Sequence, residues 1–134
     1  MSAALAQQNL RIQIQDDLKY DIRFENADLD SGQFYNEDDE TDILTAEDVD
    51  DMVVRHKGGV RSICCMDESQ GSVDLVDDVK DKKICSLSWR ASTQPGESNE
   101  FKTLNQDSDY VVEIGKWNHS GTMGEIPVTI SERS

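Results

Sequence analysis

The chain has 134 residues, of which 36% are hydrophobic and 31% are charged, and its formal net charge is −15 at pH 7. The length suffices for one domain, spanning residues 1–134, whose core needs no disulfide support. The charge argues against binding to nucleic acid or to anionic membrane surfaces, because both attract lysine and arginine, whereas neutral or zwitterionic headgroups and a purely solubilising role stay open.

The N-terminal residues 1–9 lack the basic and apolar regions of a secretory signal peptide. Elsewhere no run of about 18 apolar residues, the length that predicts a transmembrane helix, occurs. We therefore expect no signal peptide, and a protein that is cytoplasmic or leaves the cell by a non-classical route.

Alternation of apolar and polar residues begins in residues 9–25. The apolar residues of 10–14 and of 18–24 alternate with polar ones, and Asp16 and Asp17 separate the two runs. A period of two is typical of half-buried strands, and the acidic pair indicates a tight turn. We predict a β-hairpin over 9–25.

The next part of the chain is strongly acidic. Residues 37–51 contain nine Asp and Glu residues, which predicts a solvated rim loop that repulsion makes mobile. An EF-hand count that starts at Asn26 fails, because its sixth position is Ser31 instead of glycine and its flanks alternate like strands. We predict no dedicated metal site, and a weak cation site among the acids is the alternative.

Further strands follow, and helix is confined to a short turn with Thr45 as N-cap. Alternation predicts strands at 85–89, 110–114 and 126–130, and weaker patterns predict strands at 33–35, 52–55, 60–65, 71–76 and 99–104. Pro127 has no N–H to donate, so the last strand is predicted to lie at a sheet edge or to begin beside one. Many short strands predict an all-β antiparallel sandwich or barrel.

The three cysteines are Cys64, Cys65 and Cys85, and no CxxC spacing occurs. An odd number without that spacing predicts neither a disulfide framework nor a zinc site. A disulfide from Cys85 to Cys64 or Cys65 is one alternative, and buried free thiols are the favoured one.

Residues for catalysis are not grouped in the sequence. The only histidines, His56 and His119, lie in predicted turns, and no GxSxG, HExxH or glycine-rich phosphate loop occurs. Nothing places two carboxylates around a pocket. We predict that the protein is not an enzyme and has no cofactor.

The two tryptophans are candidate contact residues. Trp89 is in phase with Leu87 and Cys85, so it is either a core residue or one that leans to the end of a sheet. Trp117 lies in a polar turn, where its amphipathic ring suits a membrane interface or a binding surface. The alternative is a ring that folds back over the end of the sandwich as a lid.

The order of several segments resembles the aegerolysin family over most of the chain. They are SGQFY at 31–35, GSVDLVD at 71–77, Trp89 in its strand, PGESN at 95–99 and the closing strands from 110 to 130. The resemblance implies a two-sheet antiparallel β-sandwich with a short helical turn at most.

The resemblance also implies function. It implies a non-enzymatic protein, peripheral at membranes, that recognises a sphingolipid headgroup: sphingomyelin with cholesterol, or ceramide phosphoethanolamine. It implies a larger perforin-like (MACPF) partner that forms the pore, so that the chain is the targeting component of a two-component cytolysin.

This sequence departs from the family in its tryptophans. Asn9, Ser31 and the region near Pro95 lack the tryptophans that lipid-binding members carry there, and each buried tryptophan contributes about 1 to 3 kcal/mol. Glu68 matches an acidic residue of a family loop that sets lipid selectivity. The candidate lipid-binding residues are Trp89, Trp117, Glu68, Pro95 and Tyr35. The alternative function is an acidic protein-interaction module that kept the fold, lost lipid binding and meets a basic partner.

Overall fold

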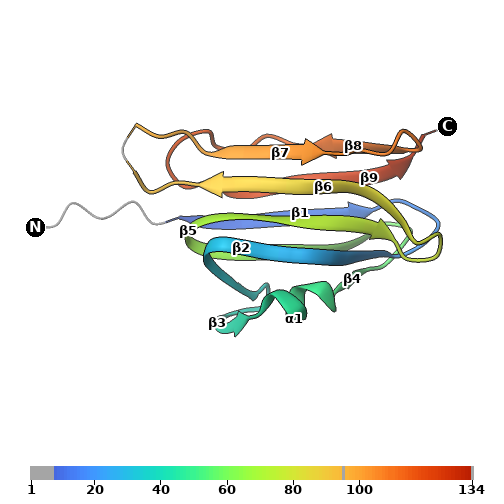
Figure 1. The fold of residues 1–134 in the computed structure, drawn as a ribbon, viewed down its shortest axis with the longest axis horizontal. Coiled ribbons are helices and arrows are strands. Elements are labelled where there is room, and N and C mark those ends of the chain that lie inside the picture. Colours follow the sequence, from blue (N-terminus) through green and yellow to red (C-terminus); the bar gives the residue numbers. More distant parts are fainter. Residues whose placement is uncertain (1–7, 95, 134) are drawn as a thin grey trace, which may run out of the picture.

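A computed structural model of the chain, shown in Figure 1, describes residues 8–94 and 96–133. In this part of the chain the elements are β1 (Asn9–Asp16), β2 (Ile22–Asn36), β3 (Asp39–Leu44), α1 (Ala46–Asp50), β4 (Val53–Val54), β5 (Gly59–Asp77), β6 (Lys82–Ala91), β7 (Glu100–Leu104), β8 (Tyr110–Ile114) and β9 (Gly124–Glu132). The all-β prediction is confirmed, and the single helix has only five residues.

The strands form two sheets that share β2 and β5. One sheet has the order β3, the second half of β2, the first half of β5, β1, β9 and β8. The other has the order β4, the first half of β2, the second half of β5, β6 and β7. Buried side chains from both sheets make one core, so the predicted β-sandwich is confirmed, with β1 and β9 as its one parallel pair among the described strands.

The long strand β5 changes direction where it passes between the sheets. It is antiparallel to β1 from Gly59 to Met66 and antiparallel to β6 from Ser69 to Asp77, while β1 and β6 point in opposite directions in Figure 1. β2 stays paired with β5 around this bend, with shifts in register. The strands predicted at 60–65 and 71–76 are therefore the two halves of β5.

Two glycines permit the bend. Gly32 has φ +88°, which L side chains rarely adopt, and a Cβ there would lie 2.7 Å from the Ser69 Cβ. A Cβ at Gly71 would lie 2.5 Å from the Asp28 carbonyl oxygen and 2.9 Å from the Trp89 ring. Gly71 thus lies within a strand, where it lets Trp89 pack close to the β2 backbone.

Replacing Gly71→Ala should destabilise the protein by about 1 to 3 kcal/mol, because the added methyl overpacks a filled site. Urea unfolding measures this loss. Ser72→Ala, on the next and outward-facing position, is the matched control and should change stability by less than about 0.5 kcal/mol. Equal effects of the two substitutions would contradict close packing at Gly71.

The predicted hairpin over 9–25 is wrong. β1 pairs with β5 and β9 instead of β2, and β2 begins only at Ile22. Leu18 is 2% exposed although it lies in the connection between them. The alternation therefore reported burial correctly, but burial does not identify the strand that pairs with β1.

Of the two positions predicted for the last strand, the edge position is wrong, and a start beside an edge is confirmed because β8 pairs with β9 only from Val128 onward. β9 lies between β1 and β8. The last β8 pair is Ile114 with Val128, and beyond it the Gly115 N–H donates to the Pro127 carbonyl over 2.8 Å. Because proline has no N–H to return that bond, the β8 ladder ends there.

The acidic segment 37–51 forms β3 and α1, so the predicted loop is wrong. The predicted Thr45 N-cap is confirmed: its hydroxyl accepts the Asp48 N–H over 3.1 Å, and the Asp48 carboxylate accepts the Thr45 N–H over 2.9 Å. Val49 is buried in the core and holds α1 along the side of the sandwich between β3 and β4 (Figure 1).

The three cysteines are free and buried, as the favoured alternative predicted. Burial raises the pKa of the Cys85 thiol to about 12. These thiols are therefore protonated at neutral pH and pack as small apolar groups.

A buried carboxyl group lies at the end of the sandwich opposite the bend. Asp16 is 0% exposed; one carboxylate oxygen accepts the Leu18 N–H over 2.8 Å and the other has no partner. Burial raises the pKa of Asp16 to about 7, and the nearby Asp21 and Asp77 carboxylates add to the rise. Ionised Asp16 is thus costly for the folded state.

The Asp16 pKa predicts a pH-dependent stability. An unfolded aspartate has a pKa of about 4, so between about pH 4 and 7 the folded state holds a proton that the unfolded state releases. The stability from Asp16 is therefore present at low pH and lost as the pH rises to about 7. Relative to Asp16→Asn, the wild type should lose on the order of 2 to 4 kcal/mol over that range, measured by urea unfolding.

The exposed neighbour Asp17 supplies the control for this measurement, since Asp17→Asn removes the same charge. Its stability difference from the wild type at each pH is the baseline for removing one carboxylate from this connection. A difference for Asp16→Asn that follows this baseline from pH 4 to 7 would contradict the raised pKa of Asp16.

Candidate functional site

The candidate residues predicted from the sequence do not form one exposed site. Trp89 is 2% exposed and Tyr35 6%, so both are buried, and the Tyr35 hydroxyl donates to the Asn9 side-chain oxygen over 2.7 Å. Glu68 is exposed on the β5 bend. Pro95 lies outside the described residues. Of the two positions predicted for Trp89, a core residue or one that leans to the end of a sheet, the structure shows the core residue.

The end of the sandwich at the bend gathers segments that are distant in sequence. We call this the bend end; it comprises the β2–β5 bend and the described residues of three segments, 92–94, 96–99 and 115–123. Gln8 joins its parts: its carbonyl accepts the Asp67 N–H over 3.1 Å, and its side-chain amide donates to the Gly121 carbonyl over 2.6 Å. Glu68, next to Asp67, and the segment that carries Trp117 therefore share one end.

A buried pair of amides, Gln8 and Asn99, organises the bend end. Each is 3% exposed. The two hydrogens of the Gln8 amide nitrogen serve the Ser92 carbonyl over 2.5 Å and the Gly121 carbonyl over 2.6 Å, and the Asn99 side-chain oxygen lies 3.1 Å from the same nitrogen. The Gln8 side-chain oxygen accepts the Met123 N–H over 2.9 Å. We call this pair the amide hub, because it satisfies backbone groups of both loop segments at once.

Asn99 holds the segment around Trp117 from the other side. Its backbone N–H donates to the His119 carbonyl over 2.7 Å, and its side-chain amide donates to the carbonyls of Asn118 and Gly121, both over 3.0 Å. Its side-chain oxygen also accepts the Ser92 N–H over 3.0 Å. Buried polar groups that are bonded in this way fix one loop geometry.

Replacing Asn99→Ala should leave buried partners in both loop segments unsatisfied and cost on the order of 1 to 3 kcal/mol. Hydrogen exchange should quicken in 92–99 and 115–123 together, which mass spectrometry of peptides measures. Gln94→Ala, at an exposed position of the same segment, is the control and should leave both unchanged. Faster exchange in 92–99 alone would contradict a shared hub.

Trp117 is held against the core and borders a surface groove. It is partly buried, its ring meets Phe101 edge-on at 6.4 Å between centroids, and it stacks on His119 at 4.0 Å with an interplanar angle of 24°. The groove is lined by Ile114, Gly115, Lys116, Trp117 and His119. The sequence left two positions open for Trp117, a ring at a surface and a ring folded back over the end of the sandwich. In the structure one part of the ring covers the core and another part lines the groove.

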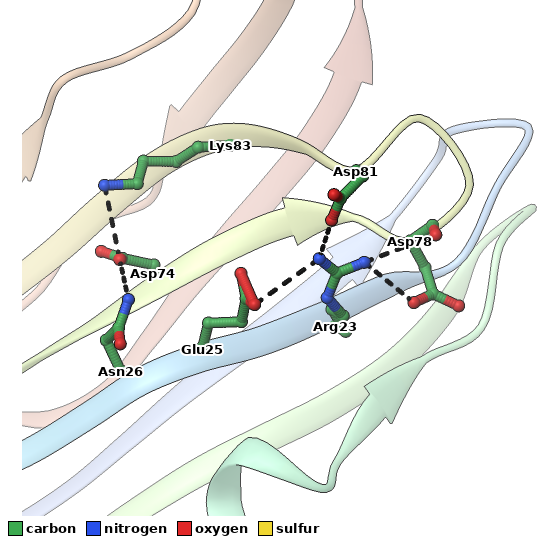
Figure 2. Close-up of polar contacts among 7 residues, drawn as sticks. All are labelled: Arg23, Glu25, Asn26, Asp74, Asp78, Asp81 and Lys83. Atoms are coloured by element: carbon green, nitrogen blue, oxygen red, sulfur yellow. Dashed lines mark hydrogen bonds and ion pairs between the residues drawn. The ribbon is translucent and has the colours of Figure 1, made fainter.

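The densest charged cluster lies elsewhere and is structural. Figure 2 shows Arg23 between Glu25 at 3.5 Å, Asp78 at 3.3 Å and Asp81, near the end opposite the bend. These carboxylates raise the pKa of Arg23, so it stays charged. Arg23 therefore ties β2 to the turn between β5 and β6.

The second part of this cluster surrounds Asp74. Its carboxylate accepts the Ser86 hydroxyl over 2.6 Å. Figure 2 shows its other two partners: the Asn26 amide donates to it over 2.8 Å, and the Lys83 ammonium lies 3.4 Å away. Burial raises the pKa of Asp74, but the bonds from Ser86 and Asn26 outweigh it and the net shift is downward. Asp74 on β5 thus contacts side chains of both neighbouring strands, β2 and β6.

In residues 8–94 and 96–133, no group of three or more His, Cys, Asp and Glu side chains is placed to hold a metal ion. No helix in this part of the chain is both long and apolar enough to cross a membrane. His56 bonds to Asp21, and this bond lowers the pKa of the Asp21 carboxyl.

The fold and the bend end define a small β-sandwich with a groove on its surface. The family model for aegerolysins matches residues 7–133, and the chain belongs to the aegerolysin family. It is 34% identical over 113 residues to terrelysin from Aspergillus terreus, covering 82% of this chain and 77% of terrelysin. It is 29% identical over 118 residues to Asp-hemolysin from Aspergillus fumigatus, covering 84% of this chain and 83% of that protein.

Solved structures show the same fold. The RahU protein, crystallised in complex with a TRIS molecule, superposes with a TM-score of 0.86 at 24% identity and 98% coverage of both chains. IP-1A from Alcaligenes faecalis superposes with a TM-score of 0.80 at 22% identity, covering 98% of this chain and 94% of that one. The resemblance read from the sequence is thereby confirmed.

Sequence reasoning missed the amide hub and the groove beside Trp117. Gln8 and Asn99 are polar residues at the start of predicted strands, a position that many exposed residues also occupy. Lys116 and His119 flank Trp117 in sequence, and that adjacency was the only signal for the groove.

Proposed function

We propose that this protein binds membrane lipids, without enzymatic chemistry, through the bend end that carries Trp117. The observation that carries the proposal is the half-buried Trp117 ring, which borders a surface groove and is held by the amide hub on an aegerolysin fold. An amphipathic ring in a rigid frame suits a water–lipid interface, because little conformational entropy is lost on binding. The name of the relative Asp-hemolysin supports a relation to cytolysins.

Within this function, the proposed ligand is a sphingolipid headgroup, either sphingomyelin with cholesterol or ceramide phosphoethanolamine. The net charge of −15 disfavours anionic lipid surfaces and leaves zwitterionic ones accessible. Glu68 is exposed at the same end and supplies a carboxylate for the ammonium of such a headgroup. Pro95 is also proposed as a lipid-contacting residue, on the basis of the sequence alone.

The proposed biological setting follows from the family. The protein acts peripherally at membranes, from the cytoplasm or after non-classical secretion, and targets a perforin-like partner to the lipid. Family membership supports this setting.

A second candidate function is the acidic interaction module. Carboxylates crowd the side of the sandwich formed by β3 and α1, where the residues of β3 are mostly exposed. A basic protein partner would be complementary to that side. In this case binding would be to protein and independent of lipid.

Co-sedimentation with vesicles distinguishes the two functions. The protein should pellet with sphingomyelin/cholesterol or ceramide phosphoethanolamine vesicles more than with plain phosphatidylcholine. Trp117→Ala should weaken this binding about tenfold or more, since an interfacial ring is lost. Leu104→Ala is the control: it removes a hydrophobic side chain that is 45% exposed at the end of β7, away from Trp117, and should leave binding unchanged.

Absence of binding to all three vesicle types, at low and physiological salt, would contradict lipid recognition and favour the interaction module. Thermal unfolding of Trp117→Ala shows whether a loss of binding reflects loss of fold.

A further inference from the structure

We infer that the groove beside Trp117 binds a phosphate group carried by a zwitterionic headgroup, phosphocholine or phosphoethanolamine. The inference rests on the proposed function for the ligand and adds the place where its phosphate is bound and the residues that hold it. Lys116 and His119 supply the polar contacts, and Trp117 supplies the wall.

The groove is built on a rigid frame. On one side the Gly115 N–H is bonded to the Pro127 carbonyl over 2.8 Å, which fixes the point where the chain leaves β8. On the other side the His119 carbonyl accepts the Asn99 N–H over 2.7 Å. Lys116 and Trp117 lie between these two anchors, so their backbone positions are set before any ligand arrives.

The side chains that line the groove are unusual for this chain. Lys116 and His119 carry nitrogen groups, and no carboxylate lines the groove, although the chain has 28 acidic residues. Two other surface grooves mix acids with arginines: one has Asp21, Asp51 and Asp78 beside Arg55 and Arg61, and another has Glu37, Asp42 and Asp48 beside Arg61. Unlike these two, the groove beside Trp117 has a lysine and no carboxylate in its lining.

Lys116 is available for a ligand. Two lysines on β6 are already paired, Lys82 with Asp107 and Asp109, and Lys83 with Asp74. Within residues 8–94 and 96–133, no such ion pair with a carboxylate involves Lys116 or His119. A lysine ammonium binds phosphate as a point charge, and an imidazole N–H adds a directed bond.

Stacking keeps the imidazole in place. The His119 and Trp117 rings lie 4.0 Å apart at 24°, so the two rings hold each other in a nearly parallel arrangement. Hydrogen bonds of an imidazole lie in its ring plane, so the edge of the His119 ring stays available to an acceptor. The Phe101 contact holds Trp117 in turn.

Net charge selects the kind of phosphate. A charge of −15 repels free anions at long range, whereas Lys116 acts within the screening length of about 8 Å at physiological salt. A zwitterionic headgroup has no net charge, so it avoids the long-range repulsion and still presents its phosphate to Lys116. Phosphocholine should therefore bind better than inorganic phosphate, and glycolipid or sterol headgroups should gain nothing from this groove.

The test uses the whole chain and four variants: Lys116→Gln, His119→Gln, the double variant, and the control Lys102→Gln, an exposed position on β7. Soluble phosphocholine and inorganic phosphate are titrated while tryptophan fluorescence is followed; Trp117 lines the groove, whereas Trp89 is buried and contributes a background signal. Phosphocholine should perturb the wild type and Lys102→Gln, and Lys116→Gln should bind it about tenfold more weakly, the cost of one charged contact. Phosphate should bind more weakly than phosphocholine.

Vesicles form the second arm, comparing sphingomyelin with a glycosylceramide that lacks phosphate. The double variant should lose about tenfold or more in binding to sphingomyelin and keep whatever binding to glycosylceramide the wild type shows. Vesicle binding without any response to phosphocholine, or equal binding by the double variant and Lys102→Gln, would overturn the phosphate site and leave lipid binding standing. A phosphocholine response without vesicle binding would support the site and contradict the proposed function.

Discussion

The pairing of β2 with β5 around one bend is the constraint on which the rest of this structure depends. It carries two strands from one sheet to the other while their backbone hydrogen bonds stay largely satisfied. Gly32 and Gly71 make the bend sterically possible, and Gly71 admits the Trp89 ring. The two sheets, their shared core and the bend end with its groove all depend on this pairing.

The two ends of the sandwich are stabilised differently. At the bend end, buried uncharged amides bind loop carbonyls and amides, which gives direction without the desolvation cost of charges. At the opposite end, Arg23 and its carboxylates are held in ion pairs, and Asp16 is buried with one oxygen unpaired. A surface that binds a ligand needs a fixed backbone and side chains that are not already paired. The bend end has both.

The changes from the family pattern have a structural counterpart. Neither Asn9 nor Ser31 has an aromatic ring: Asn9 accepts the Tyr35 hydroxyl, and Ser31 pairs with Gln70 in the bend. The proposed site shifts recognition from inserted aromatic rings towards one half-buried tryptophan with polar neighbours. Such a site would recognise the polar headgroup by hydrogen bonds and charge at the membrane surface, and would depend less on inserting aromatic rings into the bilayer.

The sequence by itself determined most strand segments, though not β3, and it determined the Thr45 cap, the free buried thiols and the family, since these depend on local pattern and composition. Tertiary structure alone decided that β1 pairs with β5 and β9, that Pro127 lies inside a sheet, and that Trp89 is core while Trp117 lines a groove. It also made the amide hub, whose partners Gln8 and Asn99 are 91 residues apart. Pairing and burial across such distances depend on how the whole chain packs, and no local pattern encodes them.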